Sequence, residues 1–224
     1  MPRLCLFDVN ETLLDLGGLD GLFAEFFGVE GVRQEWFDQV LHNAFVATIT
    51  ERYQPFGEIA SGALTMVAQR REQALTQAQH RAVLAGMVQL PPHPEVPEAL
   101  AQFKQAGFRL AALTNSTAEV VCRQLSHVGL TDMFEQILSV DVVQRLKPAQ
   151  EPYRYAAKSL GVPVRQLRMI AAHGWDIAGA AAAGCATAFV ARPGMIADPL
   201  IAPPDITGCD LMAVAIQIMA QDTP

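Results

Sequence analysis

Short apolar stretches alternate with helical patterns along most of this chain. The first, residues 4–7, is fully apolar and ends abruptly at Asp8, as expected of a strand buried on both faces. Four later stretches have the same character, namely residues 108–113, 136–140, 168–172 and 186–190. Strands that alternate with helices are typical of a parallel sheet covered on both faces. The pattern predicts an α/β fold with a Rossmann-like, doubly wound parallel sheet.

Residues 16–90 carry no strand pattern. Their apolar positions recur three and four residues apart, which predicts helices, over residues 19–27, 34–49, 58–73 and 76–88. The proline-rich segment 91–94 then predicts a stiff hinge. We therefore expect a Rossmann-like core of residues 1–15 and 92–224, with an all-helical cap of residues 16–91 inserted after the first strand.

The composition narrows the possible partners. The chain has 224 residues, of which 51% are hydrophobic and 17% are charged, enough apolar material for a sizeable core. Its net charge is −7 and it has no basic cluster, so nucleic acid is not an expected partner. No apolar run is long enough to span a bilayer, so we expect no membrane association.

The N-terminus and the cysteines favour the cytoplasm. Asp8 interrupts the first apolar stretch, which therefore does not resemble a secretory signal. The four cysteines are widely spaced and form no metal-binding pattern, and we expect them to be reduced thiols in the core; they are Cys5, Cys122, Cys185 and Cys209.

Polar side chains follow the predicted strands where each strand ends. In chain order they are Asp8, Asn10, Thr12, Thr114, Asn115, Ser116, Lys147, Tyr153, His173 and Asp176. Taken singly, several have an ordinary structural explanation, such as a helix cap or a first-turn acid. The carboxyl ends of parallel strands share one edge of a sheet, however, so these side chains are expected to converge on one crevice.

The chemistry of this set points to a carboxylate nucleophile. An ionised Asp8 at a buried strand end needs a charge partner and hydrogen bonds. Lys147 supplies the charge and keeps the pKa of Asp8 low, while Thr12 orients the carboxylate. Asp176 either positions Lys147 or activates water once Asp8 is esterified.

The order of residues 8–13, residues 113–115, Lys147-Pro148 and an acidic fourth motif resembles the haloacid dehalogenase superfamily. The resemblance covers nearly the whole chain, and the helical insertion resembles that superfamily's first cap type. It implies magnesium-dependent phosphatase activity for most members, which use an acid two residues after the nucleophile and two acids in the fourth motif. Here the first of these positions is Asn10, and the fourth motif has Ala172 ahead of Asp176.

These two differences favour the metal-free branch of the superfamily. Magnesium prefers oxygen ligands and Ala172 offers none, whereas a halide leaving group requires neither a metal nor a proton. We therefore expect no metal and no cofactor. Two further segments, Tyr153 after Lys147-Pro148 and the pair Trp175-Asp176, resemble the hydrolytic L-2-haloacid dehalogenases.

That resemblance implies a reaction and a set of roles. Asp8 attacks the halogen-bearing carbon of a short 2-haloacid with inversion, and water then hydrolyses the aspartyl ester. The catalytic residues are Asp8, Thr12, Lys147 and Asp176. The expected substrate-binding residues are Val9, Asn10, Thr114, Asn115, Tyr153, His173, Trp175 and Phe37. The resemblance also implies a homodimer.

The halide pocket departs from the family pattern. The family usually has an arginine directly after a cap tryptophan, but Phe37 follows Trp36 here, and the fourth motif has Ala171 and His173 in place of a serine and an asparagine. His173, Trp175, Phe37 or Arg52 are the candidate replacements. A histidine donor in a smaller pocket suits fluoride, which makes fluoroacetate a candidate substrate.

Two alternatives stay open from the sequence. One is a magnesium-dependent phosphatase that tolerates the missing acids. The other is a catalytically idle binding protein on the same fold, since fold does not fix function. The complete set of Asp8, Lys147 and Asp176 argues against an idle site, because a buried charge cluster is costly to retain.

Overall fold

A parallel six-stranded sheet forms the centre of the molecule in the computed structural model, which describes residues 4–222. Its strands lie in the order β3-β2-β1-β4-β5-β6. They are β1 (Leu4–Phe7), β2 (Leu110–Thr114), β3 (Gln136–Ser139), β4 (Leu167–Ala171), β5 (Ala186–Val190) and β6 (Ile206–Gly208). The predicted α/β class with a doubly wound sheet is confirmed.

The strand bounds differ slightly from the predicted ones. The second strand begins at Leu110 rather than at residue 108, and the fourth is shifted by one residue towards the N-terminus. The edge strand β6 was not predicted, because three residues in a loop-rich region carry no readable alternation. The strands next to β1 are fully buried, so the apolar runs marked the centre of the sheet well.

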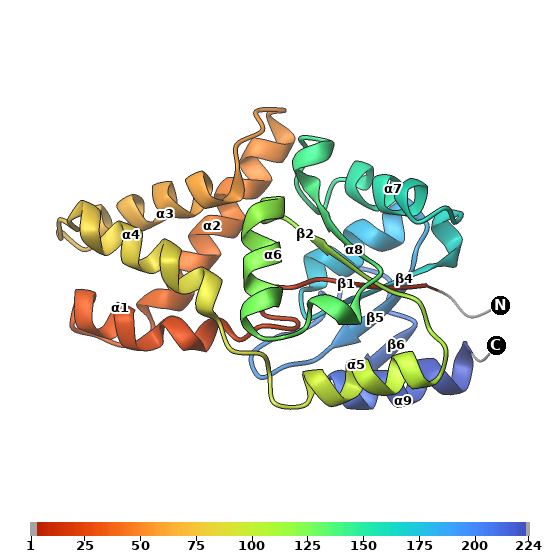
Figure 1. The fold of residues 1–224 in the computed structure, drawn as a ribbon. Coiled ribbons are helices and arrows are strands. Elements are labelled where there is room, and N and C mark those ends of the chain that lie inside the picture. The colour runs from red at the N-terminus through yellow and green to blue at the C-terminus, as the bar shows by residue number, and fades with distance from the viewer. Residues whose placement is uncertain (1–3, 223–224) are drawn as a thin grey trace.

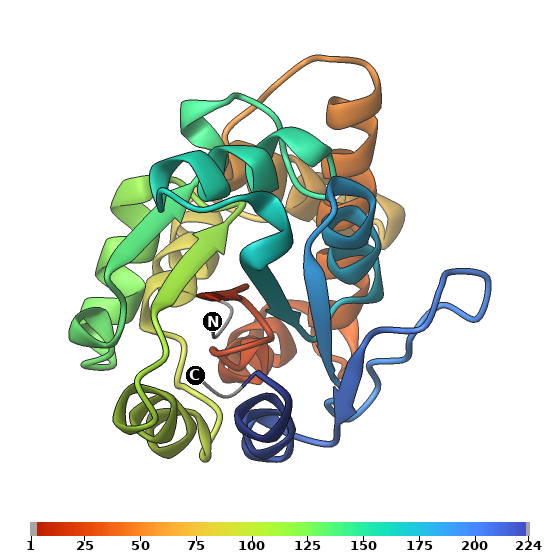
Figure 2. The ribbon, with the colours of Figure 1, turned by 90° about the vertical axis from the view of Figure 1, so that its right-hand side faces the viewer.

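Helices cover both faces of the sheet. Helices α5 (Val96–Gln105) and α9 (Leu211–Gln221) lie side by side on one face, and α7 (Gln150–Ser159) and α8 (Gly174–Ala183) lie on the other (Figures 1 and 2). Helix α6 (Ala118–His127) connects β2 to β3. Because all six strands are parallel, their carboxyl ends share one edge of the sheet.

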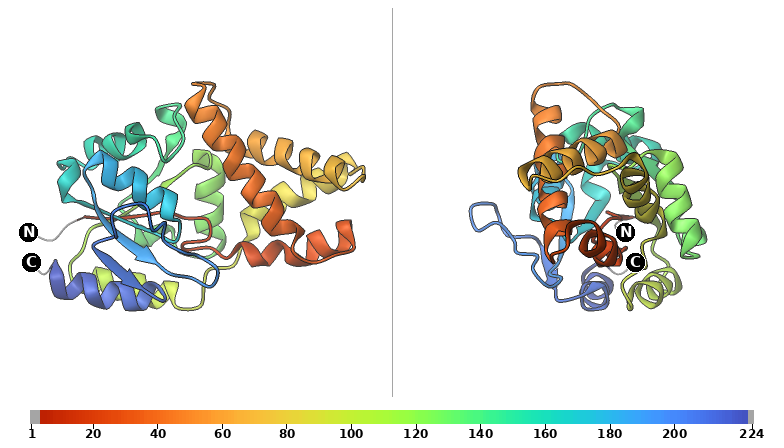
Figure 3. Two further views of the ribbon diagram at one scale, coloured as in Figure 1. Left: turned by 180° about the vertical axis from the view of Figure 1, so that it is seen from behind. Right: turned by 90° about the vertical axis from the view of Figure 1, so that its left-hand side faces the viewer.

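The segment between β1 and β2 adds a group of helices at that edge. It contains α1 (Asp20–Phe27), α2 (Val32–Ile49), α3 (Phe56–Arg70) and α4 (Gln77–Gly86), and residues 16–90 contain no strand. Figures 1 and 3 show these helices together at one end of the molecule, towards which β1 runs. The separation of residues 16–91 as a cap domain stays a prediction.

The two connections to this helical segment lie side by side. Leu14 forms an antiparallel bridge with Pro92, and the Asp15 amide donates to the Pro91 carbonyl at 2.8 Å. The His93 amide donates to the Leu13 carbonyl at 3.0 Å. This pairing fixes where the chain leaves and re-enters the core.

Trp36 belongs to the interior of the helical segment. Its side chain is buried, its indole nitrogen donates to the Ala60 carbonyl at 2.9 Å, and its ring lies 5.2 Å from that of Phe23. Since Ala60 is on α3 and Phe23 is on α1, Trp36 joins three helices. This contact places the next residue, Phe37, on the side of α2 that faces the core.

The expectation that all four cysteines are core thiols is wrong for two of them. All four are free, but Cys122 and Cys209 are exposed, whereas Cys5 and Cys185 are buried. Cys122 lies on α6, whose buried positions are Val121, Gln124 and Leu125. On an amphipathic helix, apolar neighbours in the sequence do not determine whether a cysteine lies on the buried or the exposed face.

We predict that Gly179 is required for α8 to pack. A Cβ atom there would lie 2.5 Å from the Pro148 carbonyl oxygen and 2.7 Å from the Tyr153 hydroxyl. Gly179→Ala is expected to lower the free energy of unfolding by about 2 kcal/mol through overpacking. Gly62→Ala, on α3 with open space around it, is the control and is expected to raise it by about 0.5–1 kcal/mol. Equal urea midpoints for the two variants would contradict the prediction.

Candidate active site

Asp8 lies directly after β1, where its carboxylate is held from two sides. The Thr12 hydroxyl donates to Asp8 Oδ2 at 2.7 Å and accepts from the Ala172 amide at 2.9 Å. The Asp8 amide donates to the Ile170 carbonyl at 3.1 Å. The turn after β1 is thereby attached to the end of β4, which fixes the position of the carboxylate.

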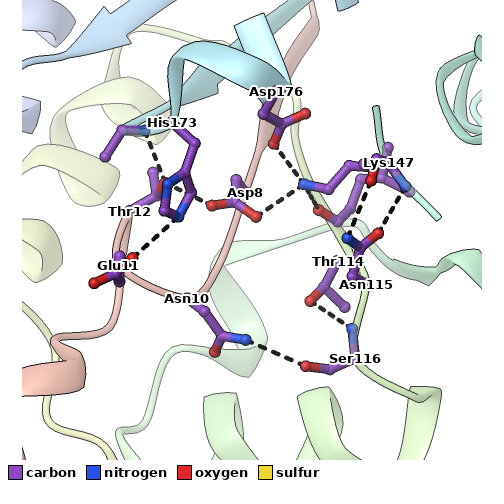
Figure 4. A network of polar contacts seen from close by, with 12 residues as sticks. Asp8, Asn10, Glu11, Thr12, Thr114, Asn115, Ser116, Lys147, His173 and Asp176 are labelled. Atoms are coloured by element: carbon purple, nitrogen blue, oxygen red, sulfur yellow. Dashed lines mark hydrogen bonds and ion pairs between the residues drawn. The ribbon is translucent and has the colours of Figure 1, made fainter. Parts of the chain in front are cut away.

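Lys147 places one ammonium between two carboxylates (Figure 4). Its Nζ lies 2.8 Å from Asp8 Oδ1 and 2.6 Å from Asp176 Oδ2, and it also donates to the Leu113 carbonyl at 3.0 Å. The side chains of Lys147 and Asp176 are completely buried, and that of Asp8 is 7% exposed. All three donor hydrogens of the ammonium are therefore engaged.

Tyr153 completes this cluster from α7. Its hydroxyl donates to Asp176 Oδ1 at 2.5 Å, so both oxygens of Asp176 have a donor. Gly179 makes room for this hydroxyl. Tyr153 is thus brought to the site, but it contacts Asp176 rather than the space in front of Asp8.

The surroundings of the two carboxylates shift their pKa values in opposite directions. Burial raises the pKa of Asp8, but the Lys147 ammonium, His173 and the Thr12 hydroxyl together outweigh burial and hold that pKa below its usual value. Burial raises the pKa of Asp176 to about 6 despite Lys147, and the negative charge of Asp8 adds to this rise. Burial opposes the charge of Lys147, yet the two carboxylates raise the pKa of the ammonium. The cluster thus favours an ionised Asp8 beside a charged lysine.

The end of β2 supports Lys147 through backbone contacts. The side-chain carbonyl of Asn115 accepts from the Lys147 amide at 2.8 Å, and its NH₂ group donates to the Lys147 carbonyl at 3.4 Å. The Thr114 hydroxyl oxygen accepts from the Ser116 amide at 3.1 Å. The Asn115 side chain therefore holds the lysine segment in place.

Asn10 is fixed by two neighbours. Its NH₂ group donates to the Ser116 hydroxyl at 3.3 Å, and its oxygen accepts from Gln124 Nε2 at 3.0 Å. Gln124 also donates to the Met87 carbonyl at 2.7 Å, so it joins the helical segment to the site. Val9 is completely buried beside Asp8.

Four aromatic rings line the boundary between α2 and the start of α8. The His173 ring stacks on Trp175 with centroids 5.0 Å apart and lies 6.1 Å from Phe37, while Phe45 lies 5.6 Å from Trp175. Lys147 Nζ is 5.8 Å from the centre of the Trp175 ring. Three of the four candidate halide-pocket residues are thus together.

The fourth candidate, Arg52, is not part of this group. Its side chain is exposed, and it lines a surface depression beside Asn43 and Glu58. It follows α2 directly after the left-handed turn residue Glu51. The expectation that Arg52 contributes to a halide pocket has no support in this arrangement.

Two residues near Asp8 were missed by the sequence analysis. Arg192 is buried after β5 and donates to the Thr12 carbonyl at 2.6 and 3.0 Å, and it also pairs with Glu95 at 2.9 Å. Glu11 approaches His173 Nε2 at 3.4 Å. The place of Arg192 at a strand end was a usable signal, because parallel strands bring their ends together.

A divalent cation does not fit between the two aspartates. The Lys147 ammonium already lies against one oxygen of Asp8 and one of Asp176, and the other two oxygens accept from Thr12 and Tyr153. Ala172 offers no side-chain oxygen where magnesium would need one. Within residues 4–222, no group of three or more histidine, cysteine, aspartate or glutamate side chains is arranged to hold a metal ion.

The fold and the strand-end cluster agree with a family match. A model of the haloacid dehalogenase-like hydrolases matches residues 2–184. The chain belongs to the haloacid dehalogenase-like hydrolase family. The predicted resemblance to this superfamily is thereby confirmed.

Individual relatives extend over nearly the whole chain. It is 29% identical over 210 residues to an (S)-2-haloacid dehalogenase of Pseudomonas sp. (strain YL), which covers 93% of this chain and 90% of the relative. It is 26% identical to haloacetate dehalogenase H-2 of Moraxella sp. (strain B), covering 90% and 91%. The L-2-haloacid dehalogenase structure from Xanthobacter autotrophicus with covalently bound chloropropionic acid has a TM-score of 0.92 at 21% identity, covering 99% and 100%. The structural likeness shows a shared fold.

We predict that Lys147→Met destabilises the protein in a pH-dependent way. Removing the ammonium leaves two buried carboxylates unpaired, at an expected cost of about 3–5 kcal/mol near pH 8. The folded-state pKa values of both carboxyls then lie above their unfolded values, so the folded variant binds protons more tightly and regains stability as the pH falls. The gap to the native protein in urea unfolding should therefore shrink between pH 8 and pH 5.

Lys104→Met is the matched control for this variant. Lys104 is exposed and donates only to a backbone carbonyl, that of Asp132, so its loss is expected to cost less than about 0.5 kcal/mol at either pH. If Lys147→Met lost the same stability at pH 5 as at pH 8, packing rather than charge would explain the cost.

Proposed function

We propose that this protein hydrolyses short-chain 2-haloacids to 2-hydroxyacids, with Asp8 as the nucleophile. The observation that carries the proposal is the Lys147 ammonium between Asp8 and Asp176. It keeps a buried carboxylate ionised without a metal. The relatives named as haloacid and haloacetate dehalogenases support the same substrate class.

In the first step, an Asp8 carboxylate oxygen attacks the carbon that bears the halogen. A carbon–oxygen bond forms from the carboxylate's electron pair, and the carbon–halogen bond breaks with its pair leaving on the halide. Attack from the opposite side inverts the carbon. We assign Thr12 to orienting Asp8, since its hydroxyl fixes Oδ2, and Thr114 and the Asn115 backbone to the substrate carboxylate.

In the second step, water hydrolyses the aspartyl ester. Esterification removes the negative charge of Asp8, which is one of the causes that raise the pKa of Asp176. Lys147 then faces only one negative charge, that of Asp176, which therefore stays ionised more readily. It is our candidate for activating the water, with Tyr153 holding its other oxygen.

The aromatic group at the start of α8 is our candidate for the leaving-group pocket. His173 and Phe37 line it, and Val9 and Asn10 border the nucleophile from the β1 turn. The indole nitrogen of Trp175 is buried and has no hydrogen-bond partner among the described residues. Neutral ring donors suit fluoride, which accepts hydrogen bonds strongly, so we propose fluoroacetate as a further substrate.

A phosphatase reaction is the less favoured alternative. An alkoxide leaving group needs a proton, and the position that supplies an acid in the phosphatases is Asn10. Each oxygen of Asp8 and of Asp176 already has a donor, and Ala172 offers no side-chain oxygen beside them, which disfavours magnesium. A catalytically idle protein has no reason to bury this charge cluster.

The assembly and the location remain predictions. We propose that residues 16–91 close over the strand ends as a cap and that the protein is a homodimer in the cytoplasm. No helix among the described residues has the length and apolar character needed to cross a membrane. Light scattering at micromolar concentration tests the dimer, and the mass of a single chain would contradict it.

The proposed reaction predicts chloride release from (S)-2-chloropropionate in excess EDTA. Asp8→Asn is expected to lower the rate by at least about 1,000-fold, since it removes the nucleophile. Asp132→Asn, at an exposed surface position, is the control and should match the native rate.

Two outcomes would contradict the proposed function. Turnover of p-nitrophenyl phosphate that requires magnesium, without chloride release, would favour the phosphatase. No turnover of either substrate would favour a binding role. Fluoride release from fluoroacetate no faster than in Asp8→Asn would exclude the fluoroacetate substrate alone.

A further inference from the structure

Glu11 adopts a backbone conformation that is unusual for its residue type. Its φ is 62°, in the left-handed region that favours glycine. The turn holds it there, because its amide donates to the Leu14 carbonyl at 2.7 Å and its carbonyl accepts from His93 Nε2 at 3.2 Å. Glycine would adopt this conformation without strain, yet the position holds a glutamate. Strained residues of this kind cluster at functional sites, so the Glu11 carboxylate is a candidate for a functional role.

The Glu11 side chain lies between the helical segment and the site. Oε2 is 3.4 Å from His173 Nε2, and Oε1 is 3.5 Å from Arg33 Nη1 on α2 (Figure 4 shows the first contact). Burial raises the pKa of Glu11 to about 7; Arg33 acts against the rise, and nearby acids add to it, namely Asp8, Asp38 and Asp15. The carboxyl therefore gains or loses its proton near neutral pH.

His173 is buried, and it lies between Glu11 and the proposed nucleophile Asp8. Burial and the Lys147 charge hold its pKa below the usual value, while the Asp8 charge and a hydrogen bond with the Asn10 backbone act in the opposite direction. Its ring is fixed by Trp175 at 5.0 Å. A neutral imidazole carries one hydrogen, and its partner decides which nitrogen holds it.

The Glu11–His173 pair therefore has two chemically different states. While the pair holds an extra proton, on either residue, the ring nitrogen away from Glu11 carries a hydrogen and can donate. When that proton is lost, the remaining ring hydrogen goes to the Glu11 carboxylate. The nitrogen away from Glu11 then presents a lone pair, which repels an anion.

We propose that Glu11 and His173 form a proton-sharing pair in which Glu11 positions a ring N–H of His173 towards the departing halide. The inference rests on the dehalogenase function proposed above. The halide leaves with the electron pair of the carbon–halogen bond, and the ring hydrogen stays on nitrogen, so no proton is consumed. His173 is thus the catalytic donor and Glu11 a positioning residue, and the Phe37 ring beside His173 supplies no charge.

The test is the pH profile of chloride release from chloroacetate between pH 5 and pH 9. Above neutrality the native protein should lose kcat/KM about tenfold per pH unit, with a midpoint near pH 7, because the pair loses its proton. The pKa values of Lys147 and Tyr153 are raised, so neither group titrates there. A fall below about pH 6 reports protonation of Asp176 instead, which changes the charge on the cluster that holds Asp8.

Glu11→Gln should remove the alkaline fall alone. The glutamine amide does not titrate and donates to His173 Nε2, so the ring keeps its donor at high pH, and the acid fall from Asp176 is unchanged. Glu72→Gln is the matched control, because Glu72 is also left-handed, with φ 53°, but exposed. It should keep the native profile. A Glu11→Gln profile that retains the alkaline fall overturns the pair.

Two further variants separate the pair from a structural role. Glu11→Gly should melt at or above the native temperature, since glycine takes φ 62° without strain, and should still lose the alkaline fall. Adding Glu11→Gln to His173→Asn should change the rate less than twofold. A destabilised Glu11→Gly with a native pH profile overturns the proposal. Absence of chloride release by the native protein overturns the proposed function as well, whereas native release with an unchanged Glu11→Gln profile overturns the pair alone.

Discussion

One buried ammonium shared by two carboxylates is the interaction on which the site depends. Lys147 contacts Asp8 and Asp176 in a region where all three side chains are almost fully removed from water. One positive charge cannot neutralise two negative ones. Burial and the charge of Asp8 therefore raise the pKa of Asp176, while the pKa of Asp8 stays low and this carboxylate stays ionised. We propose that this imbalance assigns the roles, because the ionised carboxylate is the better nucleophile and the other the better proton acceptor.

The fold holds that cluster at the edge of the sheet. The parallel pairing of β1 with β4 brings Asp8 and His173, the residue before α8, to neighbouring strand ends. Asn115 holds the backbone of Lys147. Arg192 adds a buried link from β5 to the Thr12 carbonyl. A site assembled from separate strand ends is rigid only if such links join them, which explains why so many polar contacts here run to the backbone.

The sequence was enough to predict five of the six strands, the helical insertion and the members of the charge cluster. Buried strands are apolar runs, and their carboxyl ends meet by topology, so spacing alone brings Asp8, Lys147 and Asp176 together. It was not enough for Glu11, because left-handed backbone geometry at a glutamate has no sequence signature. Nor did it place Cys122 or Arg52, since the face of a helix or turn that meets solvent depends on packing. The sequence therefore predicted the helices and strands better than it predicted the contacts between them.

The most direct test of the central claim is the source of the oxygen in the product. In a single turnover in H₂¹⁸O, with enzyme in excess over (S)-2-chloropropionate, an ester on Asp8 passes its own carboxylate oxygen to the product. We therefore predict unlabelled lactate and one ¹⁸O atom in the peptide that contains Asp8, measured by mass spectrometry. Labelled lactate with an unlabelled Asp8 peptide would contradict it, because water would then have attacked the substrate directly.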